Sequence, residues 1–301
     1  MQPILRRRTE IALVLLACAL AGFHAGPAAA AADNAGVGVV AEYRPSAGRF
    51  MFSRPPGNEQ VAVRIGTVVA PGDRVHLPVG ASIVVHLANG EVQTFNGAGD
   101  FTVPKAAPLG RLAKILGSLG DVFDAEYRLA GIAASRGGEK CGAAGAAVAD
   151  IEVPILMPGA RIAAGERDLP LAWRGGCAPF SISVLSSDKV AVHRETIDGR
   201  QVRLDDLPLS AGRYSVVITD VGGRRFAGTV EVLAAAPVIP ADIAADGSPL
   251  GVIAQAVWLS GQDGGLWRLE SFERLRPLIR AGDALAGTLG DGLLWGQVPR
   301  E

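Results

Sequence analysis

Residues 151–233 contain short runs of strand-forming residues that recur about every 8 to 12 residues, a spacing typical of β-sandwiches. The runs LPLAWRG, PFSISVLSS, KVAVHRET, RQVRLDDL, GRYSVVITD and RRFAGTVEVL are separated by turns rich in Gly, Asp and Ser. Short strands bury their apolar faces by packing as two sheets around one core. The sequence therefore predicts a β-sandwich over residues 150–235.

In this predicted sandwich, Trp173 lies on an early strand, and Leu209 and Gly212 precede Tyr214. The arrangement resembles immunoglobulin and fibronectin type III modules, in which a Trp lies in the core and a Leu-x-x-Gly-x-Tyr pattern places a tyrosine at a corner before a central strand. The resemblance implies an immunoglobulin-like β-sandwich.

Residues 37–104 also have β character. The stretch ASIVVHLANGEVQTF predicts two strands joined at Asn89-Gly90, a dipeptide that favours tight hairpin turns. Side chains alternate along a strand, so His86 is expected on the face opposite to Ile83 and Val85.

The stretch GTVVAPGDRVHLPVGASIVVHLANGEVQTFNGAGDFTVP resembles the FecR-type domain, a compact extracytoplasmic β-module of bacteria. Gly72-Asp73, Gly80-Ala81-Ser82 and Asn89-Gly90 fill the turn positions of that family. The resemblance implies a role in signalling or envelope binding without catalysis, and it assigns residues 33–105 to this domain. A direct sigma-factor regulator is not expected, because the residues before Ile11 are too few for the cytoplasmic segment of those proteins.

The first 32 residues have the pattern of a secretory signal peptide. Arg6, Arg7 and Arg8 precede an apolar run, and small residues follow Pro27. This pattern predicts release into the periplasm after cleavage. The alternative is a lipid anchor on Cys18, whose preceding residues match a lipoprotein cleavage box poorly.

Two further segments are expected to be helical or flexible. Residues 106–149 predict a helix with an apolar stripe, followed by a Gly-rich linker. Residues 236–301 predict a linker and a C-terminal helical hairpin that begins at Ser248 and Pro249, a good N-cap and first helical residue. The predicted fold class is therefore multidomain and mainly β, with helical additions.

The charge balance argues against a nucleic-acid partner. The full chain has 29 basic and 30 acidic residues and a formal net charge of −1. Proteins that bind nucleic acids need a basic face, which this near-neutral composition does not favour. No membrane span is expected in the mature chain.

Two cysteines remain after removal of residues 1–32, namely Cys141 and Cys177. An oxidising compartment favours a disulfide between them. Unpaired thiols are the alternative.

No metal site is predicted. His76 and His86 lie ten residues apart, but the nearby acids are those of ordinary hairpin turns. A bound metal needs three or more converging ligands, so these histidines are expected to be surface or half-buried strand residues.

The sequence predicts no catalytic residue and no cofactor. Ser186 to Lys189 match the S-x-x-K motif of penicillin-binding enzymes, but the motif lies between two strands and no K-T-G partner exists. Asp205-Asp206 and the pair Asp121 and Asp124 are expected in turns or on solvated faces. A serine hydrolase is thus the least favoured alternative.

These features predict a non-enzymatic periplasmic or cell-envelope adaptor or sensor that binds another envelope protein. A module that binds polysaccharide, such as peptidoglycan, is the main alternative. The candidate partner-binding residue is Trp267, because Trp is enriched at interfaces and this one lies away from the centre of its helix's apolar face. The other possibility is that Trp267 packs against the third helix of this segment.

Overall fold

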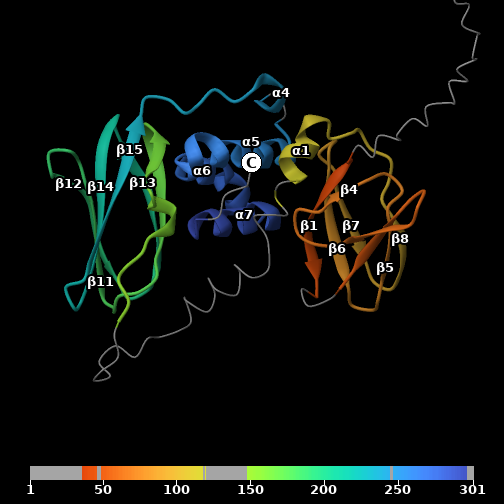
Figure 1. The fold of residues 1–301 in the computed structure, drawn as a ribbon, viewed down its shortest axis with the longest axis horizontal. Helices are drawn as coiled ribbons and strands as arrows, with labels where there is room; N and C mark the ends of the chain where they lie inside the picture. Colours follow the sequence, from red (N-terminus) through yellow and green to blue (C-terminus); the bar gives the residue numbers. More distant parts are fainter. Residues whose placement is uncertain (1–35, 46–48, 118, 120–147, 245–246, 297–301) are drawn as a thin grey trace, which may run out of the picture. The chain divides into compact units, whose positions relative to one another are not determined.

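Figure 1 shows the computed structural model, which describes residues 36–45, 49–117, 119, 148–244 and 247–296. These residues form several β-sheets and a group of C-terminal helices. The predicted class, mainly β with helical additions, is confirmed in this coarse form. The predicted signal peptide, residues 1–32, lies outside the described residues. Among the described residues, no helix is both long enough and apolar enough to cross a membrane.

The first β part consists of two four-stranded sheets that enclose a core of aliphatic and Phe side chains. One sheet has the order β4-β1-β6-β7, with β1 (Gly38–Arg44), β4 (Val68–Val69), β6 (Ser82–Leu87) and β7 (Val92–Asn96). The other has the order β3-β2-β5-β8, with β2 (Met51–Arg54), β3 (Glu59–Ala62), β5 (Arg74–Leu77) and β8 (Gly99–Thr102).

The predicted hairpin at Asn89-Gly90 is confirmed. Strands β6 and β7 pair in antiparallel register from Ser82 with Asn96 to His86 with Val92. Gly90 has a φ of 85°, a left-handed conformation that glycine adopts without strain. This turn fixes which residues of β6 face the core.

The second β part is a sandwich of a five-stranded and a two-stranded sheet. The larger sheet has the order β12-β11-β14-β15-β9, with β9 (Ala160–Ala163), β11 (Phe180–Leu185), β12 (Ala191–Ile197), β14 (Gly212–Asp220) and β15 (Arg225–Leu233). The smaller sheet pairs β10 (Gly165–Ala172) with β13 (Gln201–Leu209). Strand β9 runs parallel to β15 and was not predicted from the sequence.

Aromatic residues fill the centre of this sandwich as predicted. Trp173 is fully buried and meets Phe180 edge to face, with ring centroids 5.2 Å apart. The hydroxyl of Tyr214 donates to the carbonyl of Ser210 and accepts from its N–H, both at 3.1 Å. Tyrosine corners make this kind of contact with the backbone a few residues upstream.

Helical segments follow each β part. They are α1 (Arg111–Gly117), the short 3-10 turn η1 (Pro154–Leu156), α4 (Ala241–Ala244), α5 (Pro249–Gly261), η2 (Gln262–Gly265), α6 (Arg268–Arg280) and α7 (Ala284–Leu294). The predicted start of α5 is confirmed, because the Ser248 hydroxyl accepts from the Gly251 N–H at 3.1 Å and Pro249 is the first helical residue.

The sandwich and the helices share one continuous hydrophobic core. Leu112, Leu116 and Leu119 of the predicted stripe are buried in it, and so are Leu285, Leu289 and Leu293 of α7. The remainder of the predicted 106–149 helix and linker, residues 120–147, lies outside the described residues.

Candidate functional site

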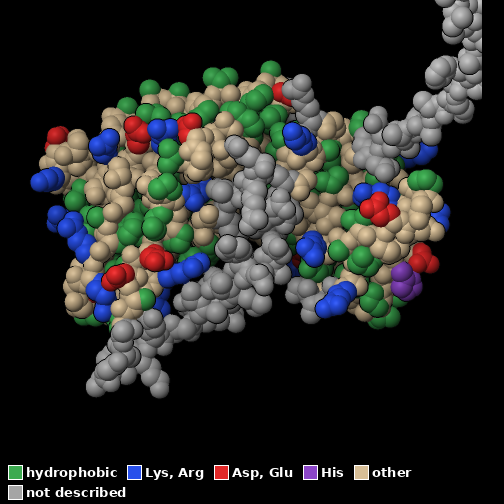
Figure 2. Space-filling model, viewed as in Figure 1, with side chains coloured by type: hydrophobic (Ala, Val, Ile, Leu, Met, Phe, Trp, Pro, Cys, Tyr) green, Lys and Arg blue, Asp and Glu red, His purple; other side chains and the backbone are tan. Residues whose placement is uncertain are grey.

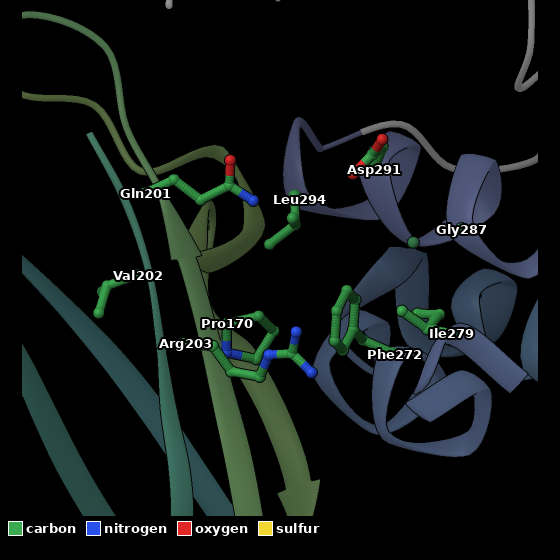
Figure 3. A pocket seen from close by; sticks show the side chains of 10 residues that line it. Pro170, Gln201, Val202, Arg203, Phe272, Ile279, Gly287, Asp291 and Leu294 are labelled. Atoms are coloured by element: carbon green, nitrogen blue, oxygen red, sulfur yellow. The ribbon is translucent and has the colours of Figure 1, made fainter. Parts of the chain in front are cut away.

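A hollow of about 330 Å³ lies between the two-stranded sheet and helices α6 and α7 (Figure 3). Strands β10 and β13 form one wall, and the helices form the other. Its lining residues are Pro170, Gln201, Val202, Arg203, Phe272, Ile279, Gly287, Gly290, Asp291 and Leu294.

The strand register explains the wall that the sheet supplies. Pro170 is paired directly with Arg203, and Ala172 with Gln201. Paired residues in an antiparallel sheet project to the same side. In Figure 3 the side chains of Pro170 and Arg203 point toward Phe272, whereas Val202 lies on the other side of the strand.

Two glycines of α7 form the opposite wall. A Cβ at Gly290 would come within 2.9 Å of Cδ1 of Ile279, so Gly290 permits the close approach of α6 and α7. A Cβ at Gly287 would meet no atom within 4 Å. Gly287 lines this hollow and also a neighbouring one that Tyr43 and Thr288 help to form, so a side chain here would enter open space next to both.

The chemistry of the hollow suits binding. Phe272, Ile279 and Leu294 are apolar, while Gln201 and Arg203 supply hydrogen-bond donors. An apolar cavity with a few polar groups is the usual form of a site that receives an apolar side chain or ligand. Its lining contains no His, Cys or Ser, and its one acidic residue is Asp291.

An ion-pair network next to the hollow fixes α6 against the sandwich. The fully buried carboxylate of Asp168 on β10 accepts from Nη1 of Arg276 at 3.0 Å and from Nη2 of Arg280 at 3.1 Å. It also accepts from the backbone N–H of Asp206 on β13 at 3.1 Å. One carboxylate thus joins the two strands to the helix.

Two glutamates of α6 strengthen this attachment through the strand backbone. Glu270 accepts from the Ala163 N–H at 2.9 Å, and Glu273 accepts from the Asp168 N–H at 3.0 Å. Burial raises the pKa of Glu273 above its ordinary value, although Arg276 and the Asp168 N–H oppose that shift. These acids satisfy backbone donors, so their role in the structure is to hold elements together.

The structure buries Trp267, the candidate partner-binding residue. Its side chain is 3% exposed, and its indole Nε1 donates to Asp263 at 2.9 Å. Asp263 in turn pairs with Arg161 on β9 at 2.6 Å. Trp267 is therefore buried in the protein, and we do not assign the partner site to it.

The predicted disulfide stays a prediction. Cys177 is buried, and its N–H donates to the carboxylate of Asp220 at 2.8 Å. Burial alone would raise the pKa of Asp220, but the bonds from Cys177 and Arg224 outweigh burial and lower it. The expected partner, Cys141, lies outside the described residues.

The two histidines of the first β part lie in different environments. His76 is exposed and lies 2.8 Å from Asp100. His86 was expected at the surface or half-buried, but it is only 7% exposed. The expectation was wrong because helices α5 and α7 contact strands β6 and β1 of this sheet. Asp283, at the start of α7, lies 3.7 Å from Nδ1 of His86. Among the described residues, no three His, Cys, Asp or Glu side chains group as a metal site.

The S-x-x-K motif lies in the turn between β11 and β12. The Ser186 hydroxyl donates to the carbonyl of Val190 at 3.3 Å. Asp205 and Asp206 lie on β13 beside the arginines of α6. The other acidic pair, Asp121 and Asp124, lies outside the described residues.

Sequence reasoning did not identify the hollow or the network beside it. The walls of the hollow come from residues far apart in the sequence, such as Pro170 and Phe272. The network beside it joins Asp168 to Arg276, which are 108 positions apart. One signal was present in α6, where Glu270 and Glu273 interrupt an otherwise ordinary amphipathic helix. Acids near an apolar stripe can indicate a helix face that packs on a polar sheet edge.

No protein-family model matches the chain, and no curated protein sequence matches it. Among solved structures, the chain is similar to CopC from Methylosinus trichosporium OB3b, with 24% identity and a TM-score of 0.20 over 28% of this chain and 90% of that chain. It is also similar to SGBP-B from a Bacteroides ovatus mixed-linkage glucan utilization locus, solved with a mixed-linkage heptasaccharide. That match has 11% identity and a TM-score of 0.17, and it covers 62% of this chain and only 37% of SGBP-B.

Proposed function

We propose that this chain is a non-enzymatic adaptor or sensor of the periplasm or cell envelope that binds another envelope protein. The signal-peptide pattern at its N-terminus supports export. The two proposed kinds of β-module, FecR-like and immunoglobulin-like, usually bind other molecules or act as spacers between domains. The observation that carries the proposal is the hollow between β10, β13, α6 and α7. In this proposal an apolar side chain of the partner enters beside Phe272 and Leu294, and polar partner groups meet Gln201 and Arg203 at its rim.

The burial of the aromatic side chains supports a protein partner over a polysaccharide. Polysaccharide sites stack sugar rings on exposed aromatic side chains. Among the described residues, the large exposed hydrophobic side chains are all Val or Met. In the sandwich, Trp173, Phe180 and Tyr214 are buried in the core. The alternative function is a peptidoglycan-binding module, and sedimentation with purified peptidoglycan tests it.

We also propose that the first β part is FecR-like and the second immunoglobulin-like. The Asn89-Gly90 hairpin supports the first assignment. The contact between Tyr214 and Ser210 supports the second. Both kinds of module imply binding without catalysis, and the position of Ser186 in a surface turn favours neither nucleophile activation nor an oxyanion site.

Gly287 offers a direct test of the hollow. Gly287→Leu should place a large apolar side chain at the wall of the hollow, where the added Cβ meets no atom within 4 Å. Gly287→Ala should fill little and should improve helix stability by up to about 1 kcal/mol. The matched control is Gly261→Leu at the end of α5, where an added Cβ also meets no atom within 4 Å.

Purified chain carrying each substitution would be cross-linked to envelope extract and the captured proteins compared by mass spectrometry. We expect Gly287→Leu to lose a partner that wild type, Gly287→Ala and Gly261→Leu all retain. Sedimentation with purified peptidoglycan tests the alternative. Retention of every captured protein by Gly287→Leu, or sedimentation that depends on Gly287, would contradict the proposal.

A further inference from the structure

A second hollow, of about 480 Å³, lies in the five-stranded sheet of the sandwich. It is lined by Leu185, Ser186, Ser187, Lys189, Arg213, Tyr214, Ser215, Arg225 and Thr229. Figure 2 shows several Lys and Arg side chains along the side of the sandwich that faces away from helix α6. This cationic hollow shares no residue with the hollow beside α7.

The register of three neighbouring strands builds the floor of the cationic hollow. Leu185 on β11 is paired with Ser215 on β14, and Ser215 is paired with Thr229 on β15. Arg213 and Arg225 lie on the same two strands, β14 and β15. The side chains of Leu185, Ser215 and Thr229 thus form the floor of the hollow, and the two arginines lie on the same strands.

The third cation, Lys189, comes from the turn between β11 and β12. Its backbone has a φ of 62°, a conformation that side-chain-bearing residues rarely adopt outside Asn and Asp. The turn is closed by bonds between Ser186 N and Val190 O and between Lys189 N and Ser186 O, both 2.9 Å long. Strained backbone of this kind is concentrated at functional sites, so the conformation of Lys189 supports a binding role for this turn.

The cations of this hollow are not neutralised by neighbouring acids. None of its lining residues is Asp or Glu, and no ion pair joins Lys189, Arg213 or Arg225 to a carboxylate within the described part of the chain. Glu231 is paired across the strands with Arg213, but its carboxylate is bound by Arg161 at 2.9 Å. Asp188, an exposed acid, lies next to Lys189 in the turn.

Asp220 on β14 lies near Arg225 in the sheet but is also already engaged. Its carboxylate accepts from Arg224 at 2.6 Å and from the N–H of Cys177 at 2.8 Å. Three exposed cations that face a common hollow without an acid attract negatively charged groups.

We propose that the cationic hollow binds the carboxylates of an acidic polypeptide segment. Arginine forks bind carboxylates through paired hydrogen bonds, and the hydroxyls of Ser215 and Thr229 can donate to the same oxygens. Leu185 in the floor and Val190, which is 64% exposed at the rim, would contact apolar side chains of that segment. This apolar component, and the presence of Asp188 and Glu231 nearby, favour a peptide over a densely charged phosphate polymer.

Fluorescence anisotropy with the full mature chain tests the proposal. The probes are a labelled peptide of alternating Glu and Val and a matched peptide of alternating Gln and Val. We expect Arg213→Gln combined with Arg225→Gln to weaken binding of the Glu peptide at least tenfold, and Lys189→Asn, which tolerates the left-handed backbone, to weaken it several-fold. The control combines Arg64→Gln with Arg74→Gln, two exposed arginines of the first β part, and should change binding less than twofold.

Binding of the Glu peptide should also weaken as salt increases, and the Gln peptide should bind poorly. Equal binding by wild type and the Arg213, Arg225 double variant, with unchanged melting temperature, would overturn the proposal. So would tighter binding of inorganic phosphate, or of vesicles containing phosphatidylglycerol, through the same arginines. Failure here leaves the Gly287 result unaffected, because the two experiments concern different residues.

Discussion

The carboxylate of Asp168 on β10 lies 3.0 Å from Nη1 of Arg276 on α6, although 108 positions separate them in the sequence. The Asp168 side chain is fully buried, whereas that of Arg276 is 24% exposed. Arg280 and the Asp206 N–H occupy the other positions around the same carboxylate. This acid, together with Glu270 and Glu273 of α6, therefore attaches α6 to the sandwich next to the hollow.

Asp168→Ala should destabilise the protein by about 3 to 5 kcal/mol, because it leaves two arginines and a backbone donor without their acceptor. Urea unfolding measures the change in the free energy of unfolding. Asp205→Ala is the control, since its carboxylate is 58% exposed and lies 3.8 Å from Arg280. A loss below about 1 kcal/mol, as expected for the control, would show that the Asp168 network contributes little.

Acid should weaken the fold through His86. Burial lowers the pKa of His86 below its ordinary value of 6.5, and the nearby Asp283 opposes that shift only in part. The unfolded chain therefore binds this proton more readily than the folded protein does. The stabilisation from neutral His86 is expected to be complete above about pH 6.5 and to decline as the pH falls below that value.

The measurement is urea unfolding of wild type and His86→Gln between about pH 5 and pH 8. The free energy of unfolding should fall more for wild type than for the variant on going to acid. A wild type that gains stability relative to His86→Gln at low pH would instead show that the ion pair with Asp283 dominates over burial.

Trp267→Ala should lower the free energy of unfolding by about 3 to 5 kcal/mol, as truncation of a core aromatic does. The reason is the burial of the ring and the loss of its bond to Asp263. Thermal unfolding and a partner-capture assay on the same variant separate the two interpretations. Weaker capture with stability changed by less than about 1 kcal/mol would restore Trp267 as a contact residue.

Reduction of the native protein should lower its stability if Cys141 and Cys177 are bonded. A disulfide that closes a loop of about 36 residues is worth roughly 3 to 4 kcal/mol in the chain-entropy model. Thiol titration of unreduced, denatured mature chain should find no free thiol. Two titrating thiols per chain would refute the pairing.

Local sequence patterns predicted many elements correctly because their causes are local. The Asn89-Gly90 turn requires a glycine with positive φ, and the Ser248 cap requires a hydroxyl before Pro249. Trp173 was expected in the core because large apolar residues on strands are normally buried. Strand β9 was missed, since its four residues show too little alternation to stand out.

The sites could not be predicted in the same way. Asp263 lies close to Trp267 in the sequence, but no local pattern shows that it also pairs with Arg161 of β9 and that the Trp267 ring is buried. The burial of His86 likewise accompanies contacts of α5 and α7 with β6 and β1, which are distant in the sequence. The cationic hollow combines Lys189, Arg213 and Arg225, which are separated along the chain and meet through strand pairing.

The sequence by itself determined the β-rich class, the turns, the helix caps and the expectation of export, because alternation, glycine conformation and capping act over a few residues. The tertiary structure alone decided that α6 lies on β10 through Asp168, that Trp267 is buried, and that three cations share one hollow. Those outcomes depend on long-range pairing of strands and helices, whose free energy is spread over many contacts and leaves no local pattern in the chain.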